Sequence, residues 1–355
     1  MQLLDEAGTI REGEELDVAA VDQFLKKNNV EVRGGLSVKQ FPGGASNLTY
    51  LLRYDNVDFI LRRPPFGKKA KSAHDMAREA KVLQALKPVY PYVPTVVALC
   101  QDDAVMGCDF YVMERLKGFI IRKDFPKDLN LLPEQARKLC FNMFDRLIEL
   151  HKVDVEKAGL SHIGKGEGYV KRQIEGWNGR FRQAHTPDVP DCETIMNWLQ
   201  AKMPEKDVAI CMIHNDYKMD NIVVDPNDPT NVIGVLDWEM ATLGDPMMDF
   251  GNAMAYWIQA DDDPFSQASR MQPSNYPGMP TRAEIIAYYG EKTGWRVDNF
   301  DFYLINGLFR LAVIAQQIYY RFYHGQTKDQ RFSMFLKVVH ALEKRCLQLI
   351  EQSAL

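Results

Sequence analysis

The fold is decided by a short polar stretch in the second half of the chain, which reads HNDYKMDN at residues 214–221. Two apolar runs follow it, residues 222–225 and 232–236, and the turn-forming residues between them predict a β-hairpin. Asp216 lies just before this hairpin and Asp237 just after it. The spacing H-x-D-x-x-x-x-N therefore puts the aspartate on a loop and makes the asparagine the first residue of a strand.

The first third of the chain is predicted to be a small sheet with one helix packed on it. A helix near Asp17 comes first, and a second helix is capped by Ser72 and ended by Pro88. The expected strands cover residues 36–41, 49–54, 58–62, 95–100 and 110–114. We therefore expect an α+β lobe over residues 1–116.

The rest of the chain, residues 117–355, is predicted to be mostly helical apart from the hairpin. Apolar residues recur at helical spacing in seven segments, which are 133–152, 169–184, 192–201, 249–259, 281–293, 300–323 and 330–352. The expected fold class is α+β, with a small β-rich N-lobe and a larger helical C-lobe.

The amino-acid composition excludes some classes of function. The 355 residues are 46% hydrophobic and carry a net charge of -5, which argues against a nucleic-acid or membrane partner. The six cysteines are scattered and form no zinc-type spacing. No secretory signal or long apolar run is visible, so we expect a cytoplasmic protein. The oligomeric state stays open.

The order of the motifs suits phosphoryl transfer, which needs a group for the attacking hydroxyl, ligands for a phosphate-bound metal, and positive charge on the transferring oxygens. The octapeptide matches the catalytic-loop pattern of protein kinases, and a metal-binding aspartate follows it in those enzymes. On its own the pattern could be an ordinary polar loop. The elements before the octapeptide follow the order found in kinases. They are a Gly-rich turn, a strand ending in a cation at Arg62, a helix with Glu79 and a strand ending at Glu114.

Together these blocks resemble the aminoglycoside phosphotransferase and choline kinase superfamily, whose members share the bilobal protein-kinase-like fold. The similar stretches are residues 59–65, 78–80, 214–221, 235–239 and 244–249. They span nearly the whole chain.

The resemblance implies a set of roles. Asp216 is expected to be the catalytic base, and Asn221 and Asp237 are expected to hold Mg²⁺. Arg62 stands where many kinases have the phosphate-binding lysine, with Glu79 as its partner. An Arg here is a departure, because Arg and Lys are not interchangeable at a phosphate site. The alternative is that Arg62 and Glu79 form only a surface ion pair. Arg63, on the opposite side of the strand, could confuse the assignment.

The remaining nucleotide contacts are implied by the same resemblance. Lys218 is placed to neutralise charge on the transferred phosphoryl group. ATP phosphates are expected near Gly43, Gly44 and Ser46, although a hairpin turn needs glycine in any case. The adenine is expected at the backbone between the two lobes, around Glu114 and Leu116.

The acceptor is expected to be a small molecule that is anionic. Residues 165–182 carry five cations and two anions in the region where this family has its substrate-side helices. Stretches 168–173, 277–282 and 309–321 are similar to the kinase domain found fused to acyl-CoA dehydrogenases, which implies a hydroxyacyl-CoA acceptor. The residues expected near it are Arg172, Trp177, Arg310 and Arg321.

Other interpretations stay open. Trp177 and its aromatic neighbours could simply be core residues, and the arginines could form helix-surface pairs. The enzyme could act on aminoglycosides instead. The fold could also serve as a nucleotide-binding pseudokinase, although such a module has no need for Asp216, Asn221 and Asp237 together.

Overall fold

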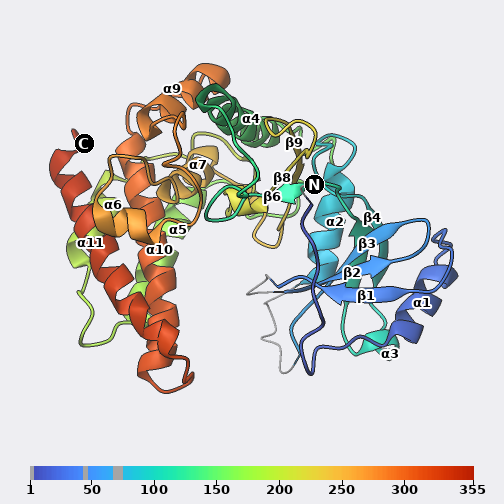
Figure 1. Cartoon of the computed structure of the whole chain (residues 1–355). Helices are drawn as coiled ribbons and strands as arrows, with labels where there is room; N and C mark the ends of the chain where they lie inside the picture. The colour runs from blue at the N-terminus through green and yellow to red at the C-terminus, as the bar shows by residue number, and fades with distance from the viewer. Residues whose placement is uncertain (1–3, 43–46, 67–74) are drawn as a thin grey trace. The chain divides into compact units, whose positions relative to one another are not determined.

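A computed structural model describes residues 4–42, 47–66 and 75–355 (Figure 1). The predicted phosphate contacts at Gly43, Gly44 and Ser46, and the helix cap at Ser72, lie outside the described residues. The chain divides into two compact units, and neither is a single run of sequence. Unit 1 comprises Met1–Ile120, Glu156–Leu160 and Asn221–Ala241, and unit 2 comprises Ile121–Val155, Ser161–Asp220 and Thr242–Leu355. The predicted boundary between residues 116 and 117 stays a prediction.

Unit 1 is built on a five-stranded antiparallel sheet in the order β1-β2-β3-β5-β4. The strands are β1 Ser37–Gln40, β2 Leu48–Arg53, β3 Asp58–Arg63, β4 Val96–Cys100 and β5 Phe110–Glu114. All five strands were expected from the sequence. Side chains alternate across the sheet, so Leu61 joins the core on one face and Arg62 points to the other.

Three helices accompany this sheet in the described part of unit 1. Helix α1, Val18–Lys27, begins after Asp17, whose carboxylate accepts a hydrogen bond from the backbone N–H of Ala20. Its buried Val21 and Leu25 belong to the same core cluster as the sheet. Helix α2, Met76–Leu86, packs against β4 and β5, and a short helix α3, Asp103–Met106, was not expected.

The predicted hairpin is present in unit 1 as β8 Ile222–Val224 and β9 Val232–Val235, and β6 Phe119–Ile120 extends it to three strands. Strand β6 was missed because two residues are too short for a periodic signal. Gly118, just before it, is required by close packing, since a Cβ there would lie 2.4 Å from the backbone oxygen of Val224.

Unit 2 is mainly helical, with a two-stranded ladder of β7 Cys211–Ile213 and β10 Thr242–Gly244. Its helices are α4 Pro133–His151, α5 Tyr169–Gln183, α6 Glu193–Lys202, α7 Pro246–Ala255, α8 Pro264–Ser269, α9 Arg282–Thr293, α10 Phe300–Tyr323 and α11 Phe335–Gln352. Figure 1 shows α11 running alongside α10, which also packs on α5, α6 and α7. Among the described residues, no helix is long and apolar enough to cross a membrane.

Close backbone approach fixes the packing of α7 on α10. A Cβ on Gly251 would lie 2.5 Å from the carbonyl oxygen of Tyr303, and one on Gly307 would lie 2.5 Å from the carbonyl oxygen of Gly251. Only glycine fits at these two positions. This contact sets the place of α7, which carries Asp249.

Several predicted bounds in unit 2 are wrong. Helix α7 begins at Pro246 and not at residue 249, because Asp245 caps it through the N–H groups of Met247 and Met248. Residues 330–352 do not form one helix, since a 3₁₀ turn at Gln330–Met334 precedes α11. Helix α8 and the strands β7 and β10 were not expected.

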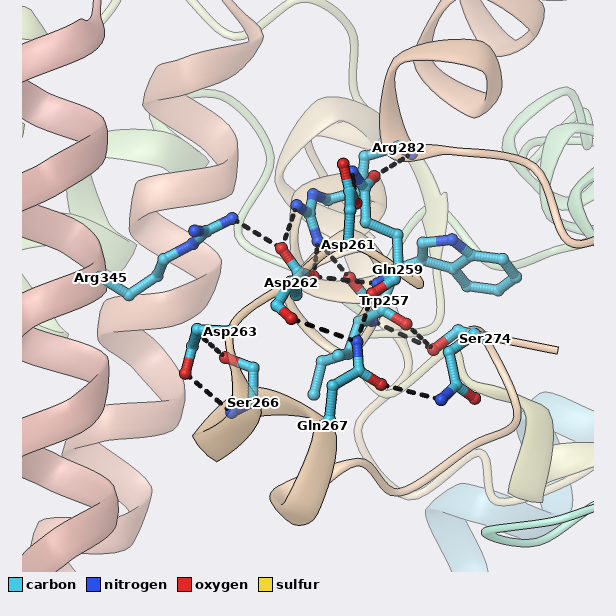
Figure 2. Close-up of polar contacts among 12 residues, drawn as sticks. Trp257, Gln259, Asp261, Asp262, Asp263, Ser266, Gln267, Ser274, Arg282 and Arg345 are labelled. Carbon is cyan, nitrogen blue, oxygen red and sulfur yellow. Dashed lines mark hydrogen bonds and ion pairs between the residues drawn. The ribbon is translucent and has the colours of Figure 1, made fainter.

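An ion-pair network ties down the segment that follows α7 (Figure 2). Asp262 accepts hydrogen bonds from Arg282 at 2.5 and 2.7 Å and from Arg345 at 3.0 Å. Arg282 also donates to the backbone oxygen of Trp257 at 2.8 Å. The network links the start of α9 and helix α11 to the chain just beyond Tyr256.

Candidate active site

Asp216 lies in a cation-rich setting in unit 2. The Lys218 ammonium is 3.1 Å from one carboxylate oxygen of Asp216, and the Tyr256 hydroxyl donates to the other at 3.3 Å. Burial alone would raise the pKa of Asp216, but the positive charges of Lys218 and Arg310 lower it below its ordinary value. The side chain is 22% exposed, so an ionised carboxylate can meet a ligand.

Lys218 is held beside this carboxylate. Its ammonium also lies 3.7 Å from Asp220 and 5.2 Å from the centre of the Tyr256 ring. Burial alone would lower the pKa of Lys218, but the negative charge of Asp216 raises it well above its ordinary value. The ammonium therefore keeps its charge at neutral pH.

The loop that carries Asp216 is shaped by a buried carboxylate that the sequence analysis did not assign. The two oxygens of Asp249 accept hydrogen bonds from the backbone N–H groups of His214, at 2.8 Å, and Asn215, at 2.6 Å. His151 contacts the same carboxylate at 3.0 Å and the Tyr289 hydroxyl at 2.7 Å. Asp249 thus fixes the backbone immediately before Asp216.

This frame holds an unusual backbone conformation. Asn215 has a φ of 67°, in the left-handed region that asparagine tolerates better than most residues. Its side chain accepts a hydrogen bond from Tyr169 at 3.0 Å, and its carbonyl oxygen accepts one from Arg310 at 2.9 Å. A residue stays in such a conformation only when the surrounding contacts hold it there. Non-glycine residues with a left-handed backbone concentrate at functional sites.

Unit 1 contains a separate ionic cluster. The Arg62 guanidinium lies 3.1 Å from Glu79 and 3.0 Å from Asp237. Arg62 is 8% exposed and Glu79 is 1% exposed, so the alternative of a surface ion pair is wrong. Burial alone would lower the pKa of Arg62, but Glu79 and the other facing groups raise it well above its ordinary value. Glu79 also accepts from the backbone N–H of Trp238 at 3.2 Å.

The hairpin brings Asn221 and Asp237 to the same end of unit 1. The N–H of Leu236 donates to the carbonyl oxygen of Asn221 at 2.8 Å, and Asp237 is the next residue. Asp237 has a φ of 66°, and its side chain is 32% exposed. Asn221 is only 7% exposed. One carboxylate and one amide oxygen suit Mg²⁺, which binds few protein ligands and keeps several waters.

Arg63 is separated from this cluster. It donates to the backbone oxygen of Pro64 at 3.1 Å, and its guanidinium stacks 3.7 Å from the centre of the Phe66 ring. Arg62 is therefore the arginine that faces Asp237. In the described part of the chain no cluster of three or more His, Cys, Asp or Glu side chains could hold a metal.

The two residues predicted to line an adenine site make structural contacts. The Glu114 carboxylate accepts from the N–H of Thr95 at 2.8 Å and from Lys87 at 3.0 Å. The carbonyl oxygen of Leu116 accepts from Gly118 at 3.0 Å, and its side chain lies against Gly234. A nucleotide contact at either residue stays a prediction.

The predicted acceptor residues fall into three settings in unit 2. Arg310 is 6% exposed and contacts the loop that carries Asp216, and its guanidinium lies 5.5 Å from the centre of the Trp177 ring. Arg172 turns back to its own loop and donates to the carbonyl oxygen of Gly166 at 2.7 Å. Arg321 is exposed on α10 and lines a groove with Arg180, a residue the sequence analysis did not single out.

Comparison with known proteins gives the family. Residues 37–285 match the phosphotransferase enzyme family, and this chain belongs to it. Acyl-CoA dehydrogenase family member 11 of Rattus norvegicus is 31% identical over 334 residues, which are 93% of this chain and 42% of the rat protein. The chain therefore spans less than half the length of this relative.

Solved structures agree with the family. A protein from Ralstonia eutropha, provisionally named an aminoglycoside phosphotransferase, is 28% identical with a TM-score of 0.81, over 96% of this chain and 100% of its own. A thermostable aminoglycoside phosphotransferase solved with AMP-PNP and hygromycin B is 13% identical with a TM-score of 0.58, over 94% of this chain and 99% of its own. The expected protein-kinase-like α+β fold is confirmed. The chain is a small-molecule kinase that transfers a phosphoryl group to an alcohol.

Proposed function

We propose that this kinase transfers the γ-phosphate of ATP to a hydroxyl group of a hydroxyacyl-CoA. The observation that carries the proposal is the charge around Asp216. Lys218 contacts this carboxylate and Arg310 lies close enough to lower its pKa. Arg180 lies 4.2 Å from the centre of the Trp177 ring, on the same helix, α5. Cations beside Asp216 suit an anionic acceptor molecule and disfavour a polycationic aminoglycoside.

In the proposed reaction, Asp216 accepts a hydrogen bond from the acceptor hydroxyl and orients its oxygen toward the γ-phosphorus. A bond forms between that oxygen and phosphorus, the bond from phosphorus to the β,γ-bridging oxygen breaks, and ADP leaves. The hydroxyl proton passes to the Asp216 carboxylate and then to solvent. Because the pKa of Asp216 is lowered, its main contribution is orientation, with proton transfer late in the reaction.

In this proposal, named residues face the negative charges of the transferred phosphoryl group and of the nucleotide phosphates. Lys218, which stays protonated beside Asp216, would stabilise the phosphoryl oxygens. Arg62 would contact nucleotide phosphates, with Glu79 holding its guanidinium. Asn221 and Asp237 would bind Mg²⁺, which neutralises phosphate charge when bound.

Two rival functions are less well supported. A pseudokinase would have no use for a carboxylate held beside an ammonium on a loop fixed by a buried aspartate. An aminoglycoside kinase is favoured by the names of the structural neighbours but not by the cations near Asp216.

Incubation with magnesium and ATP and a panel of hydroxyacyl-CoAs, free hydroxy acids and aminoglycosides tests the proposal. Mass spectrometry should find one added phosphate on a hydroxyacyl-CoA. The Asp298→Asn variant, altered at an exposed aspartate paired with Arg296, is the matched control and should behave as wild type. Phosphate found only on an aminoglycoside, or on no acceptor, would overturn the proposal.

A further inference from the structure

A second feature of unit 2 lies on the surface of helices α5 and α10. Six residues line an open groove of about 490 Å³, and they are Arg180, Gln183, Ala184, Gln317, Tyr320 and Arg321. The volume lies within the range of small-molecule sites. Five of the six residues carry side-chain hydrogen-bond donors, and none is acidic. We call this the Arg180–Arg321 groove.

The two arginines of the groove differ from the other cations nearby. On α5, Lys171 pairs with Glu175, and Arg182 pairs with Glu193 at 2.7 Å. Within the described residues, no carboxylate forms an ion pair with Arg180 or Arg321, and both are exposed. Arg180 lies instead 4.2 Å from the centre of the Trp177 ring. Two arginines that line one groove without an ion-pair partner among the described residues favour an anion, and arginine matches phosphate oxygens in particular.

A chain of contacts connects this groove with the catalytic loop. Arg180 and Arg310 both stack on Trp177, and Arg310 donates to the backbone oxygen of Asn215, next to Asp216. One terminal nitrogen of Arg310 is buried and has no hydrogen-bond partner among the described residues. Cationic or aromatic side chains thus continue from the carboxylate to the groove.

The length of α10 sets the separation between the two ends. Arg310 and Arg321 are both on α10, and at the rise of an α-helix they lie roughly 16 Å apart along its axis. A short phosphorylated alcohol cannot reach from one to the other. A CoA thioester can, because its phosphates and its acyl group lie at opposite ends of the pantetheine arm.

We propose that the Arg180–Arg321 groove binds the phosphate groups of the CoA portion of the acceptor while the acyl hydroxyl reaches Asp216. This rests on the proposed function, since it names the part of that acceptor which the groove takes. Trp177 and Arg310 would line the path of the pantetheine arm between the two ends.

Isothermal titration with CoA and with pantetheine, which lacks the phosphates, tests the groove. Saturating magnesium and AMP-PNP are present throughout, so that the adenosine of CoA cannot occupy the nucleotide site. Wild type should bind CoA at least tenfold more tightly than pantetheine. Arg180→Ala and Arg321→Ala should each weaken CoA binding by about 5- to 10-fold, and the double variant should bind both ligands alike.

Arg296→Ala is the control, because Arg296 is also an exposed arginine of unit 2 and pairs with Asp298. It should leave the Kd for CoA unchanged, and all variants should bind magnesium-ATP as wild type does. Equal binding of CoA and pantetheine by wild type, or wild-type affinity for CoA in the double variant, would overturn the groove. CoA binding that depends on both arginines in a protein that phosphorylates no hydroxyacyl-CoA would overturn the proposed function alone.

Discussion

The two units hold ionic clusters of different balance. In unit 1, Arg62 faces two carboxylates, Glu79 and Asp237, so the cluster keeps an excess of negative charge. In unit 2, Asp216 lies beside Lys218 and near Arg310, which both lower its pKa, and Lys218 also lies 3.7 Å from Asp220, so two cations face two carboxylates. We infer that unit 1 offers its surplus carboxylate to a metal cation, while the cations of unit 2 meet anionic oxygens.

The largest expected effect is on turnover. Asp216→Asn removes the carboxylate that we propose orients the hydroxyl and takes its proton, so kcat should fall by about 10³-fold. The Kd for magnesium-ATP should not change, because the nucleotide ligands are assigned to other residues. Steady-state kinetics and titration calorimetry measure the two quantities. Unchanged kcat would show that Asp216 is not the base.

Asp249→Asn should be the most damaging change that contacts no substrate. An amide can no longer accept from His214, Asn215 and His151 together, and leaves a buried donor facing a donor. The free energy of unfolding should decrease by about 3 kcal/mol. Chemical denaturation measures it, and kcat should fall more than the Kd for magnesium-ATP rises. A stable and fully active variant would remove Asp249 from the frame of the loop.

Asp245 should behave differently from Asp249. Burial alone would raise the pKa of Asp249, but its hydrogen bond with His151 and its other contacts lower it. Burial raises the pKa of Asp245, the cap of α7, to about 6. Between about pH 4 and pH 6 the folded state therefore keeps a proton that the unfolded state loses, so the free energy of unfolding should decrease as the pH rises. The decrease across this range is roughly 3 kcal/mol.

Denaturation curves at several pH values, compared for wild type and Asp245→Asn, isolate this contribution. The variant should lose that part of the pH dependence, although it also loses the hydrogen bond that the Asp245 carboxylate accepts from Val208. The same slope in both proteins would contradict the raised pKa.

The smallest effect concerns the helix that carries Trp177 and Arg180. Gly179 lies inside α5 with open space around a Cβ, so Gly179→Ala should raise the free energy of unfolding by about 0.5–1 kcal/mol. Gly251→Ala is the matched contrast, since its Cβ would meet the backbone of Tyr303, and it should destabilise the protein. Thermal unfolding of both variants tests the pair. A stabilised Gly251→Ala would contradict the close packing of α7 on α10.

The sequence predicts contacts between residues that are near each other along the chain better than contacts between distant ones. Asp216 and Asn221 belong to one octapeptide, and Asp237 follows a hairpin that its turn residues predict. Short stretches of sequence are therefore enough to predict that these three residues group together. His151 is 98 residues from Asp249, and neither burial nor pairing over such a distance shows in periodicity. The cap at Asp245 and the proline after it were visible signals for the start of α7, and weighing them would have corrected that bound.

The Arg180–Arg321 groove illustrates the same limit. A count of charges predicted cations in residues 165–182, but it could not separate Arg182, which is paired with Glu193, from Arg180, which is not. Arg172 was expected near the acceptor and makes contacts to its own loop instead. Pairing depends on neighbours from other helices, and only the folded chain supplies them.

The division of work between the two clusters is tested most directly by the Kd for ATP as a function of magnesium concentration. The titration compares wild type, Asp216→Asn and Asp237→Asn, with Asp298→Asn as control. We expect Asp216→Asn and the control to follow wild type, whereas Asp237→Asn should lose most of the magnesium dependence. Magnesium dependence that survives in Asp237→Asn and disappears in Asp216→Asn would contradict it.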